Sequence, residues 1–466
     1  MKYMQYALAA ILAAQPVIGN AETREDHLAW LKENQDAKPQ FIVGDTITYE
    51  DADLLRPFIP KEQQESLLFE GMEMKIVENN DLSPHPVYFT ATEKFYGSAT
   101  LASDGALENY TAGRPFDPSK FTPGSSEDGW KLAWNYMYRW QYAGISVNDV
   151  QWIWVRPGGD HVGHEAVTNT GGKYKDNYLG GGKFERLLRG PYQRVLMSHR
   201  SDLPESNYLF NNGKGFAKGT NFREHTAFVS PFDIAGTSFL ILRYADPRKA
   251  DDSWAYIPSL RRVRRISVEV KYDSLLGTDH TLEDFYGFNG RPLEHTWVYI
   301  GTAKILAINS SRNVNAVFYG PNGWAMLDDW QLRDYYVLNQ IPVSGSHPYK
   351  EKFLYLEQST SMCFYANAYD RGGELWKSWQ MSKSWTEDPD FRPIAMGQHG
   401  AKTTPPEIPG QPPGSGVRVP SFQSINVIDH QGDRGTLVPC FGNSYPSPKF
   451  TTVKRTMDVN YLTEGR

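Results

Sequence analysis

The stretch Ser253–Arg291 reads SWAYIPSLRRVRRISVEVKYDSLLGTDHTLEDFYGFNGR and carries the strongest fold signal in the chain. In its first part, side chains alternate so that Trp254 and Tyr256 share one face of a strand. Pro258 ends the pairing, and four arginines follow within five positions. The stretch therefore predicts an aromatic strand, a strongly basic strand and then an acidic and aromatic loop.

The arginines of this stretch allow two interpretations. In the functional one, Arg262 and Arg264 line a rim that receives a ligand headgroup or docks a partner protein. In the structural one, arginines and nearby acids form an ion-pair lattice between the sheet and the loop, because an uncompensated buried charge is strongly destabilising. The residues assigned to this lattice are Arg261, Arg265, Asp279, Glu283 and Asp284.

Aromatic residues make up 14% of the chain, which favours a β-rich core and also suits the lining of an apolar cavity. An ordinary aromatic core is the plain alternative for any one of them. The candidates for the cavity lining are Trp254, Tyr256, Phe285, Tyr286 and Phe288.

Short β-rich runs bounded by Gly, Pro, Asn or Asp continue on both sides of this stretch. Their near-regular spacing predicts a large, mainly antiparallel sheet or an open barrel. The expected strands are Val150–Arg156, Tyr192–His199, Arg223–Ser230, Thr237–Tyr244, Ser253–Ile257, Val263–Val270, Thr296–Lys304, Leu332–Val343, Lys352–Leu356 and Ser361–Asp370.

Helical patterns are confined to the first part of the chain. Thr23–Asn34 has acids in its first turn, and Lys61–Ile76 spaces its apolar residues helically. Ser126–Trp140 begins with a capping sequence and has one apolar face. We expect the last of these helices to cover the sheet.

The first residues resemble a secretory signal peptide. Lys2 precedes the short apolar core Ala7–Ala14, and Gly19-Asn20-Ala21 fits a small-x-small cleavage site. The core is too short to span a bilayer, which needs about 20 apolar residues. We therefore expect residues 1–21 to be removed, leaving a secreted, soluble protein that starts at Glu22.

The remaining chain divides by composition into two parts. Residues 22–149 read as a helix- and loop-rich extension packed on the sheet, and residues 150–466 as the sheet domain. A Pro/Gly-rich loop occupies residues 403–421 of the second part. The formal net charge of −6 gives no reason to expect a nucleic acid as a partner.

The two cysteines, Cys363 and Cys440, are candidates for one disulfide in an oxidising compartment. Two separate buried thiols are an equal alternative, because spacing along the chain does not test disulfide geometry.

Catalytic motifs are weak. His161, His164 and Glu165 follow the order H-x-x-H-E behind Pro157-Gly158-Gly159, which fits a loop rather than a helical zinc motif. We expect no catalytic residue, no metal site and no cofactor. A carbohydrate-active hydrolase with paired carboxylates stays open, because sequence does not show which carboxylates converge.

The central stretch also resembles a known family. The run from Trp254 to Arg265 is similar to the W-x-Y-x-P-x-x-R-x-V-R-R signature of LolA-like outer-membrane-lipoprotein-sorting proteins, and Gly277-Thr278-Asp279 with Glu283-Asp284 fits their G-S/T-D…E-D loop. The surrounding sequence is closer to the proteobacterial domain-of-unknown-function family thirteen twenty-nine. The stretches that carry this second resemblance are Asn109–Phe116, Ser230–Thr237 and Phe285–Gly290.

The resemblance implies an α+β fold, mainly antiparallel β, with a strongly curved sheet or incomplete barrel and helices covering its open side. It also implies a periplasmic carrier of an apolar or amphipathic, lipid-like molecule that works with an RND-type transporter or the outer membrane. An accessory docking module of an envelope complex that carries no ligand is a further alternative to the hydrolase.

Overall fold

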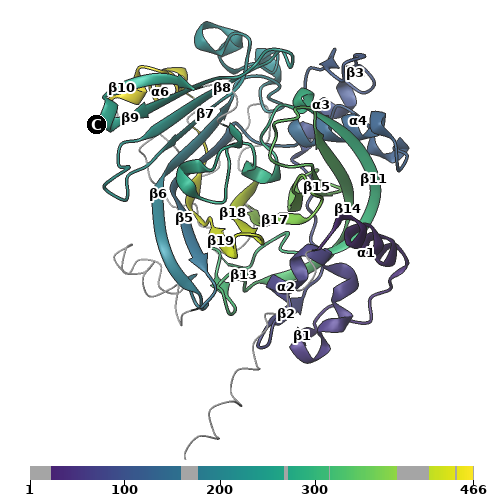
Figure 1. Cartoon of the computed structure of the whole chain (residues 1–466). Coiled ribbons are helices and arrows are strands. Elements are labelled where there is room, and N and C mark those ends of the chain that lie inside the picture. Colours follow the sequence, from purple (N-terminus) through teal and green to yellow (C-terminus); the bar gives the residue numbers. More distant parts are fainter. Residues whose placement is uncertain are drawn as a thin grey trace, which may run out of the picture.

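The computed structural model describes residues 22–158, 177–266, 271–313, 315–385, 419–446 and 449–464, and its core is one large curved sheet (Figure 1). The sheet strands are β1 (Thr46–Thr48), β2 (Glu73–Ile76), β5 (Gly144–Arg156), β6 (Lys183–Leu196), β7 (Thr220–Ala227), β8 (Ser238–Tyr244), β9 (Asp252–Ile257), β10 (Arg262–Ile266), β11 (His295–Ala307), β14 (Asp329–Pro342), β15 (Glu351–Glu357), β16 (Cys363–Tyr369), β17 (Leu375–Trp385), β18 (Pro420–Asp429), β19 (Arg434–Leu437) and β20 (Cys440–Ser444).

The order across the sheet is β1-β2-β14-β15-β16-β17-β18-β19-β5-β6-β7-β8-β9-β10, with β11 paired to β14 and β20 to β5. All pairs are antiparallel except β2 with β14. Within the described ranges no pair joins β10 to β11, so the barrel is incomplete. The expected fold class, α+β with a strongly curved antiparallel sheet, is confirmed.

The remaining elements are short. Two small hairpins pair β3 (Thr100–Leu101) with β4 (Leu107–Glu108), and β12 (Phe318–Tyr319) with β13 (Ala325–Met326). The α-helices are α1 (Arg24–Asp36), α2 (Gln64–Leu67), α3 (Pro86–Lys94), α4 (Ser126–Met137), α6 (Phe450–Thr456) and α7 (Tyr461–Glu464).

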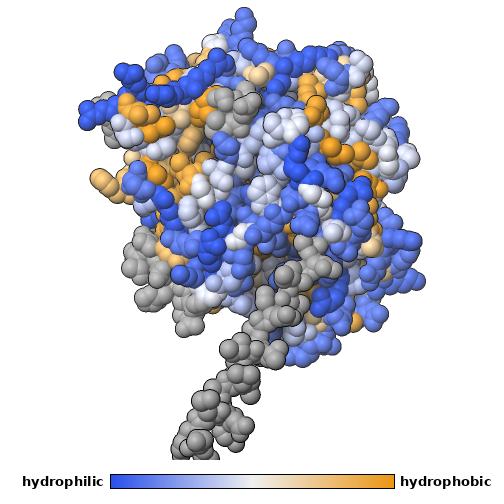
Figure 2. All heavy atoms as spheres, viewed as in Figure 1, coloured by the Kyte–Doolittle hydropathy of each residue, from blue (hydrophilic) through white to orange (hydrophobic). Residues whose placement is uncertain are grey.

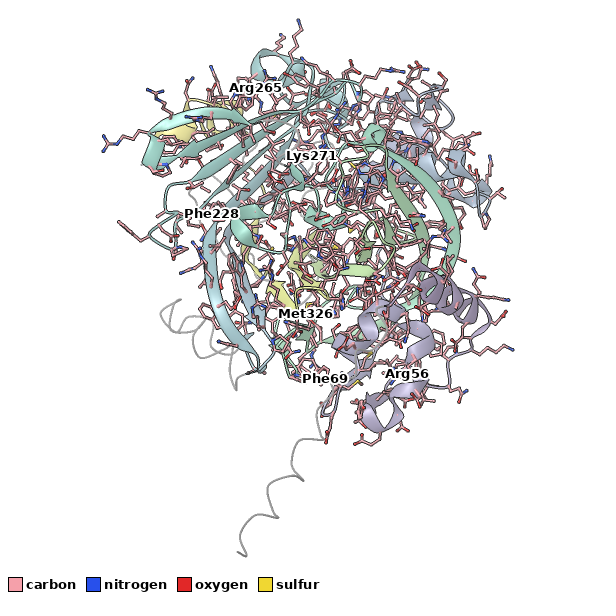
Figure 3. The ribbon with its side chains drawn as sticks, viewed as in Figure 1. Arg56, Phe69, Phe228, Arg265, Lys271 and Met326 are labelled. Atoms are coloured by element: carbon pink, nitrogen blue, oxygen red, sulfur yellow. The ribbon has the colours of Figure 1, made fainter. Side chains whose placement is uncertain are left out.

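Residues 271–294, called the interior segment below, lie inside the curve of the sheet. Lys352 of β15 donates to Asp284 of this segment at 2.7 Å, and Arg243 of β8 donates to the carbonyl oxygen of Gly290 at 2.8 Å. Strands from both arms of the sheet thus contact the segment from the same face, which is the concave one. Figure 3 shows Lys271, where the segment begins, between the two arms.

The convex face is covered by the N-terminal part of the chain. Along β15 the side chains alternate, so that Leu354 and Leu356 join the inner core and Phe353 and Tyr355 join the outer one. The outer core includes Trp30 of α1 and the apolar residues between β1 and β2. All seven residues of β15 are buried, because both of its faces are covered.

Helix α4 packs against the first half of β11. Ser125 caps the helix by accepting a hydrogen bond from the backbone N–H of Asp128, and Ser126 donates to the carbonyl oxygen of Trp297 at 2.9 Å. At Gly129 a Cβ atom would lie 2.6 Å from the backbone of Trp297. A glycine at this position therefore permits the close approach of helix and strand.

The expected helix Lys61–Ile76 is wrong. The chain forms a short 3-10 turn, then α2, and continues as strand β2. Gly71 lies between them with φ of +90°, a left-handed conformation that ends helical structure. Helices α1 and α4 lie where the sequence predicts helices. Each of the ten strands that the sequence predicts corresponds to a strand of the structure.

Some expectations fall outside the described residues. These are the signal peptide at residues 1–21, the histidine pair at 161 and 164, the second half of the expected strand Val263–Val270 (residues 267–270) and most of the Pro/Gly-rich loop at 403–421. Among the described residues, no helix is both long enough and apolar enough to cross a membrane.

Candidate functional site

Buried acids connect the interior segment to the sheet. Asp284 pairs with Lys352, and both side chains are almost fully buried. Asp279 accepts a hydrogen bond from Arg434 Nε of β19 at 2.6 Å, and its backbone carbonyl accepts one from Lys377 Nζ of β17 at 2.8 Å. The segment is therefore held by charged groups on three different strands.

Burial and charge act in opposite directions on these carboxyl groups. Burial raises the pKa of Asp284, but the positive charges of Lys352 and Lys377 outweigh it and bring the pKa below its usual range. Burial dominates at Asp279, where the pKa is raised despite the nearby Arg434.

Glu283 belongs to a cluster with His295 and His347, whose potential ligand atoms all lie within 4.8 Å. Nδ1 of His347 accepts the backbone N–H of Tyr349 at 3.0 Å, so its proton is on Nε2, which donates to Glu283 at 2.8 Å. A metal would need the nitrogen that carries this proton. The remaining two donors are fewer than the three that catalytic zinc uses, so the cluster fits a hydrogen-bonded anchor better than a metal centre.

The predicted ion-pair lattice between the arginines and these acids is wrong. Arg265 pairs with Asp252 of the neighbouring strand β9, and Arg261 is exposed after a short turn, with φ of 47°. The acids Asp279, Glu283 and Asp284 are instead buried inside the sheet with other partners. Figure 3 shows Arg265 away from the interior segment, in the outer strand β10.

Trp254 and Tyr256 lie on the convex face, so their assignment to an interior cavity is wrong. They pack with Val453 and Met457 at the C-terminal helix α6. In the pairing of β9 with β10, Tyr256 lies opposite Val263. Directly opposed residues share a face, so Arg262 and Arg264, which oppose Ile257 and Ala255, lie on the other face.

The other three predicted aromatic residues lie inside the sheet. Phe285 stacks on Tyr192 with ring centroids 5.3 Å apart, and the hydroxyl of Tyr286 donates to that of Tyr192 at 2.8 Å. The hydroxyl of Tyr136 in α4 lies 2.8 Å from the carbonyl oxygens of both Tyr286 and Phe288. Helix α4 thereby holds the aromatic part of the interior segment.

A first cavity opens beside this aromatic cluster, between α4, strands β6 to β8 and the end of the interior segment. Its empty volume is about 610 Å³, part of it open to solvent. Its aromatic lining consists of Trp134, Tyr138, Phe222, Tyr244 and Phe288.

A second cavity of about 540 Å³ lies on the other side of the chain that follows α4. Tyr286, Phe422 and Tyr445 line it, with Met362 and Val419. Two of the five predicted ligand-binding aromatics thus line the cavities, Phe288 the first and Tyr286 the second. Their role in binding a ligand stays a prediction.

Arg139 and Gln141 line both cavities and so stand between them. Arg139 is 7% exposed and its guanidinium lies over the ring of Tyr136, 4.4 Å from the centroid. Nη1 donates to the carbonyl oxygen of Tyr136 at 2.7 Å. In the part of the chain that the structure describes, no carboxylate pairs with Arg139.

The two other buried arginines of the first cavity are neutralised. Arg194 donates through Nε and Nη2 to Glu224, and Arg243 donates through both to Asp251. Burial lowers the pKa of Arg194, but the Glu224 carboxylate raises it by more, so the pKa lies above its usual value. These two pairs shape the cavity wall. Among the described residues they leave Arg139 as its buried cation without a carboxylate partner, whereas Lys249, which also lines the cavity, is exposed.

The sequence contained a signal for Arg139 that the prediction missed. Between Asp128 and Asp149 the chain has no acidic residue, so an arginine in this aromatic run has no local partner. The helical pattern of Ser126–Trp140 predicts only an aromatic face and assigns no role to Arg139. The cavities also draw on residues far apart in the chain, which no local pattern brings together.

The cysteines are free and buried. Cys363 donates to the carbonyl oxygen of Tyr365, and burial raises its pKa to about 11 and that of Cys440 to about 12. The structure thus has the two separate thiols rather than the disulfide.

Comparison with known proteins places most of the chain in one family. The family model described as a protein of unknown function, DUF1329, matches residues 46–399. No match was found among curated proteins.

Similar solved structures share low sequence identity with this chain. A putative outer membrane lipoprotein-sorting protein domain from Vibrio parahaemolyticus is 17% identical, with a TM-score of 0.44, over 73% of this chain and 100% of that one. A DUF1329 family protein from Desulfovibrio piger is 15% identical with the same TM-score and the same coverage. A LolA superfamily protein from Nitrosomonas europaea is 13% identical, with a TM-score of 0.35, over 70% of this chain and 94% of that one.

Proposed function

The chain belongs to the DUF1329 family of proteins of unknown function, and we propose that it is a periplasmic carrier of an apolar or amphipathic, lipid-like molecule. The carrier binds its ligand non-covalently and works with an RND-type transporter or the outer membrane. The signal-peptide pattern of residues 1–21 supports export to the periplasm.

The observation that carries the proposal is the pair of aromatic-lined cavities on either side of Arg139 and Gln141. Burial of apolar ligand surface in them contributes roughly 25 cal/mol per Å². Helix α4 covers this region, and Tyr136 connects the helix to the interior segment. Such an arrangement shields a ligand from water and requires no catalytic step.

The arrangement of acids favours a carrier over a hydrolase. Glycoside hydrolysis needs two carboxyl groups that flank the scissile bond in a cleft. Asp279, Glu283 and Asp284 converge on the interior, but each is held by basic or histidine partners. None of the three lines either cavity.

A docking role is a second candidate function, and an exposed apolar patch favours it. Val229 and Phe232 precede β8, Leu260 precedes β10, and their exposed fractions are 59%, 97% and 46%. The two turns meet, because a Cβ atom at Gly236 would lie 3.1 Å from Pro258. Figure 2 shows hydrophobic residues gathered at the left of the molecule, on the side of Phe228 in Figure 3. Exposed patches of this kind mark interaction sites.

The test is to purify the protein from its own periplasm without detergent and to analyse solvent extracts by mass spectrometry. We expect one apolar or amphipathic molecule in stoichiometric amount. An empty protein that also takes up no lipid-like probe in solution would contradict the carrier and leave the docking role.

A further inference from the structure

The arginine between the two cavities has a binding capacity that its surroundings do not use. Arg139 is buried, with only 7% of its surface exposed. A guanidinium has five N–H donors, and the described residues accept one hydrogen bond from it. Burying a charge without a partner is strongly unfavourable, so a site of this kind is completed by an anion.

The protein itself supplies no such anion in the described ranges. Two carboxylates beside the first cavity already have arginine partners: one oxygen of Glu224 accepts two hydrogen bonds from Arg194, and both oxygens of Asp251 accept from Arg243. The rings of Tyr136 and Tyr286 lie 4.4 and 5.7 Å from the Arg139 guanidinium carbon. Ring faces attract the cation but do not neutralise it.

We propose that Arg139 binds the carboxylate headgroup of a single-chain amphiphile, whose hydrocarbon chain extends from it into the first aromatic-lined cavity. This inference rests on the proposed carrier function and names the ligand class of the same site. One uncompensated guanidinium matches one carboxylate in charge and in its two-pronged geometry. A doubly charged phosphate would leave a net negative charge in a buried place.

The position of the headgroup follows from the cavity walls. Arg139 lines both cavities, so a carboxylate bound to it has apolar space on two sides, towards Phe288 in the first cavity and Tyr286 in the second. Gln141 lines both cavities as well and offers an amide for the second headgroup oxygen. A neutral amphiphile of the same length finds the same apolar walls but leaves Arg139 uncompensated.

The experiment compares two probes, dodecanoate and dodecanol, on the full-length protein after delipidation. The chains are equal and only the charge differs. We expect the wild-type protein to bind dodecanoate about tenfold more tightly or better at neutral pH. Equal affinity for both probes would overturn the headgroup assignment while the carrier function stands. If neither binds, the carrier proposal fails together with this one.

Variants then locate the effect. Arg139→Gln should weaken dodecanoate binding about tenfold or more and leave dodecanol binding nearly unchanged, while Arg139→Lys keeps the charge and should lose less. Arg312→Gln is the matched control, because Arg312 pairs with Asp329 at the surface and lines neither cavity. Equal weakening of both probes in Arg139→Gln would contradict the proposal. The comparison of probes on the wild type decides it even if a variant does not fold.

Discussion

Lys352 Nζ lies 2.7 Å from Asp284 Oδ1, and the two side chains are 1% and 2% exposed. This pair joins strand β15 to the interior segment, two parts of the chain that are 68 residues apart. Removal of Asp284 leaves the Lys352 ammonium group buried without its carboxylate.

We therefore predict that Asp284→Asn lowers the free energy of unfolding by about 3–5 kcal/mol. The double variant Asp284→Asn/Lys352→Met should lose less than Asp284→Asn alone, because no unpaired charge remains. Denaturant unfolding measures both. The control is Lys304→Met, which removes a surface pair whose side chains are 52% and 54% exposed. A loss no larger than in the control would contradict the buried pair.

The histidines predict a pH dependence of stability. Burial lowers the pKa of His280 from 6.5 to about 4. Between these values the unfolded chain binds a proton that the folded chain does not, so stability is complete above pH 6.5 and is lost as the pH falls towards 4.

For this one group the slope reaches at most about 1.4 kcal/mol per pH unit. His280→Gln should reduce the slope of unfolding free energy against pH in this range. His199 has a pKa lowered to about 4 in the same way, so part of the slope remains. A slope unchanged by His280→Gln would show that His280 is not buried in its neutral form.

A larger side chain in the first cavity should exclude the ligand. Ala245 lines this cavity, whereas Ala250 is exposed five residues further along the chain. We expect Ala245→Trp to lose most of the lipid-like probe bound per protein, and Ala250→Trp to bind as the wild type does. Equal binding by the two variants would place the ligand elsewhere.

Tyr256 should act as a core residue and not as a ligand contact. Tyr256→Ala removes an aromatic ring from the cluster under α6 and should lower the unfolding free energy by about 3–5 kcal/mol. Probe affinity of the folded variant should stay the same. A large loss of affinity without a loss of stability would return Tyr256 to the binding site.

The cysteines give a simple chemical test. Buried thiols with a raised pKa react slowly, so the native protein should not be labelled by a thiol reagent at neutral pH. The chain unfolded without reductant should expose two thiols. If labelling required reductant, Cys363 and Cys440 would be joined in a disulfide.

Local patterns of the sequence were sufficient to predict where the strands lie. Ser253–Ile257 and Lys352–Leu356 alternate and end at turn residues, and the structure has β9 and β15 within a residue of these bounds. The helical spacing at Lys61–Ile76 misled, because a strand pairing with β14 and a left-handed Gly71 override it. Alternation also correctly put Trp254 and Tyr256 on one face.

The sequence did not show which face that is, because it does not reveal the direction in which the sheet curves. Nor did it show ion-pair partners. Asp279 pairs with Arg434, which is 155 residues away, rather than with the nearby arginines. The buried partners are chosen by the folded sheet, and proximity along the chain was a poor guide to them.

The basic strand that dominates the sequence lies at a border of the molecule. Within the described residues β10 pairs with β9 alone, so its outer edge presents backbone groups to any extended chain. Arg262, Arg264 and Arg265 are exposed along it. A second copy that approached edge to edge would bring arginines against arginines, and this repulsion opposes aggregation of the incomplete barrel through its open margin.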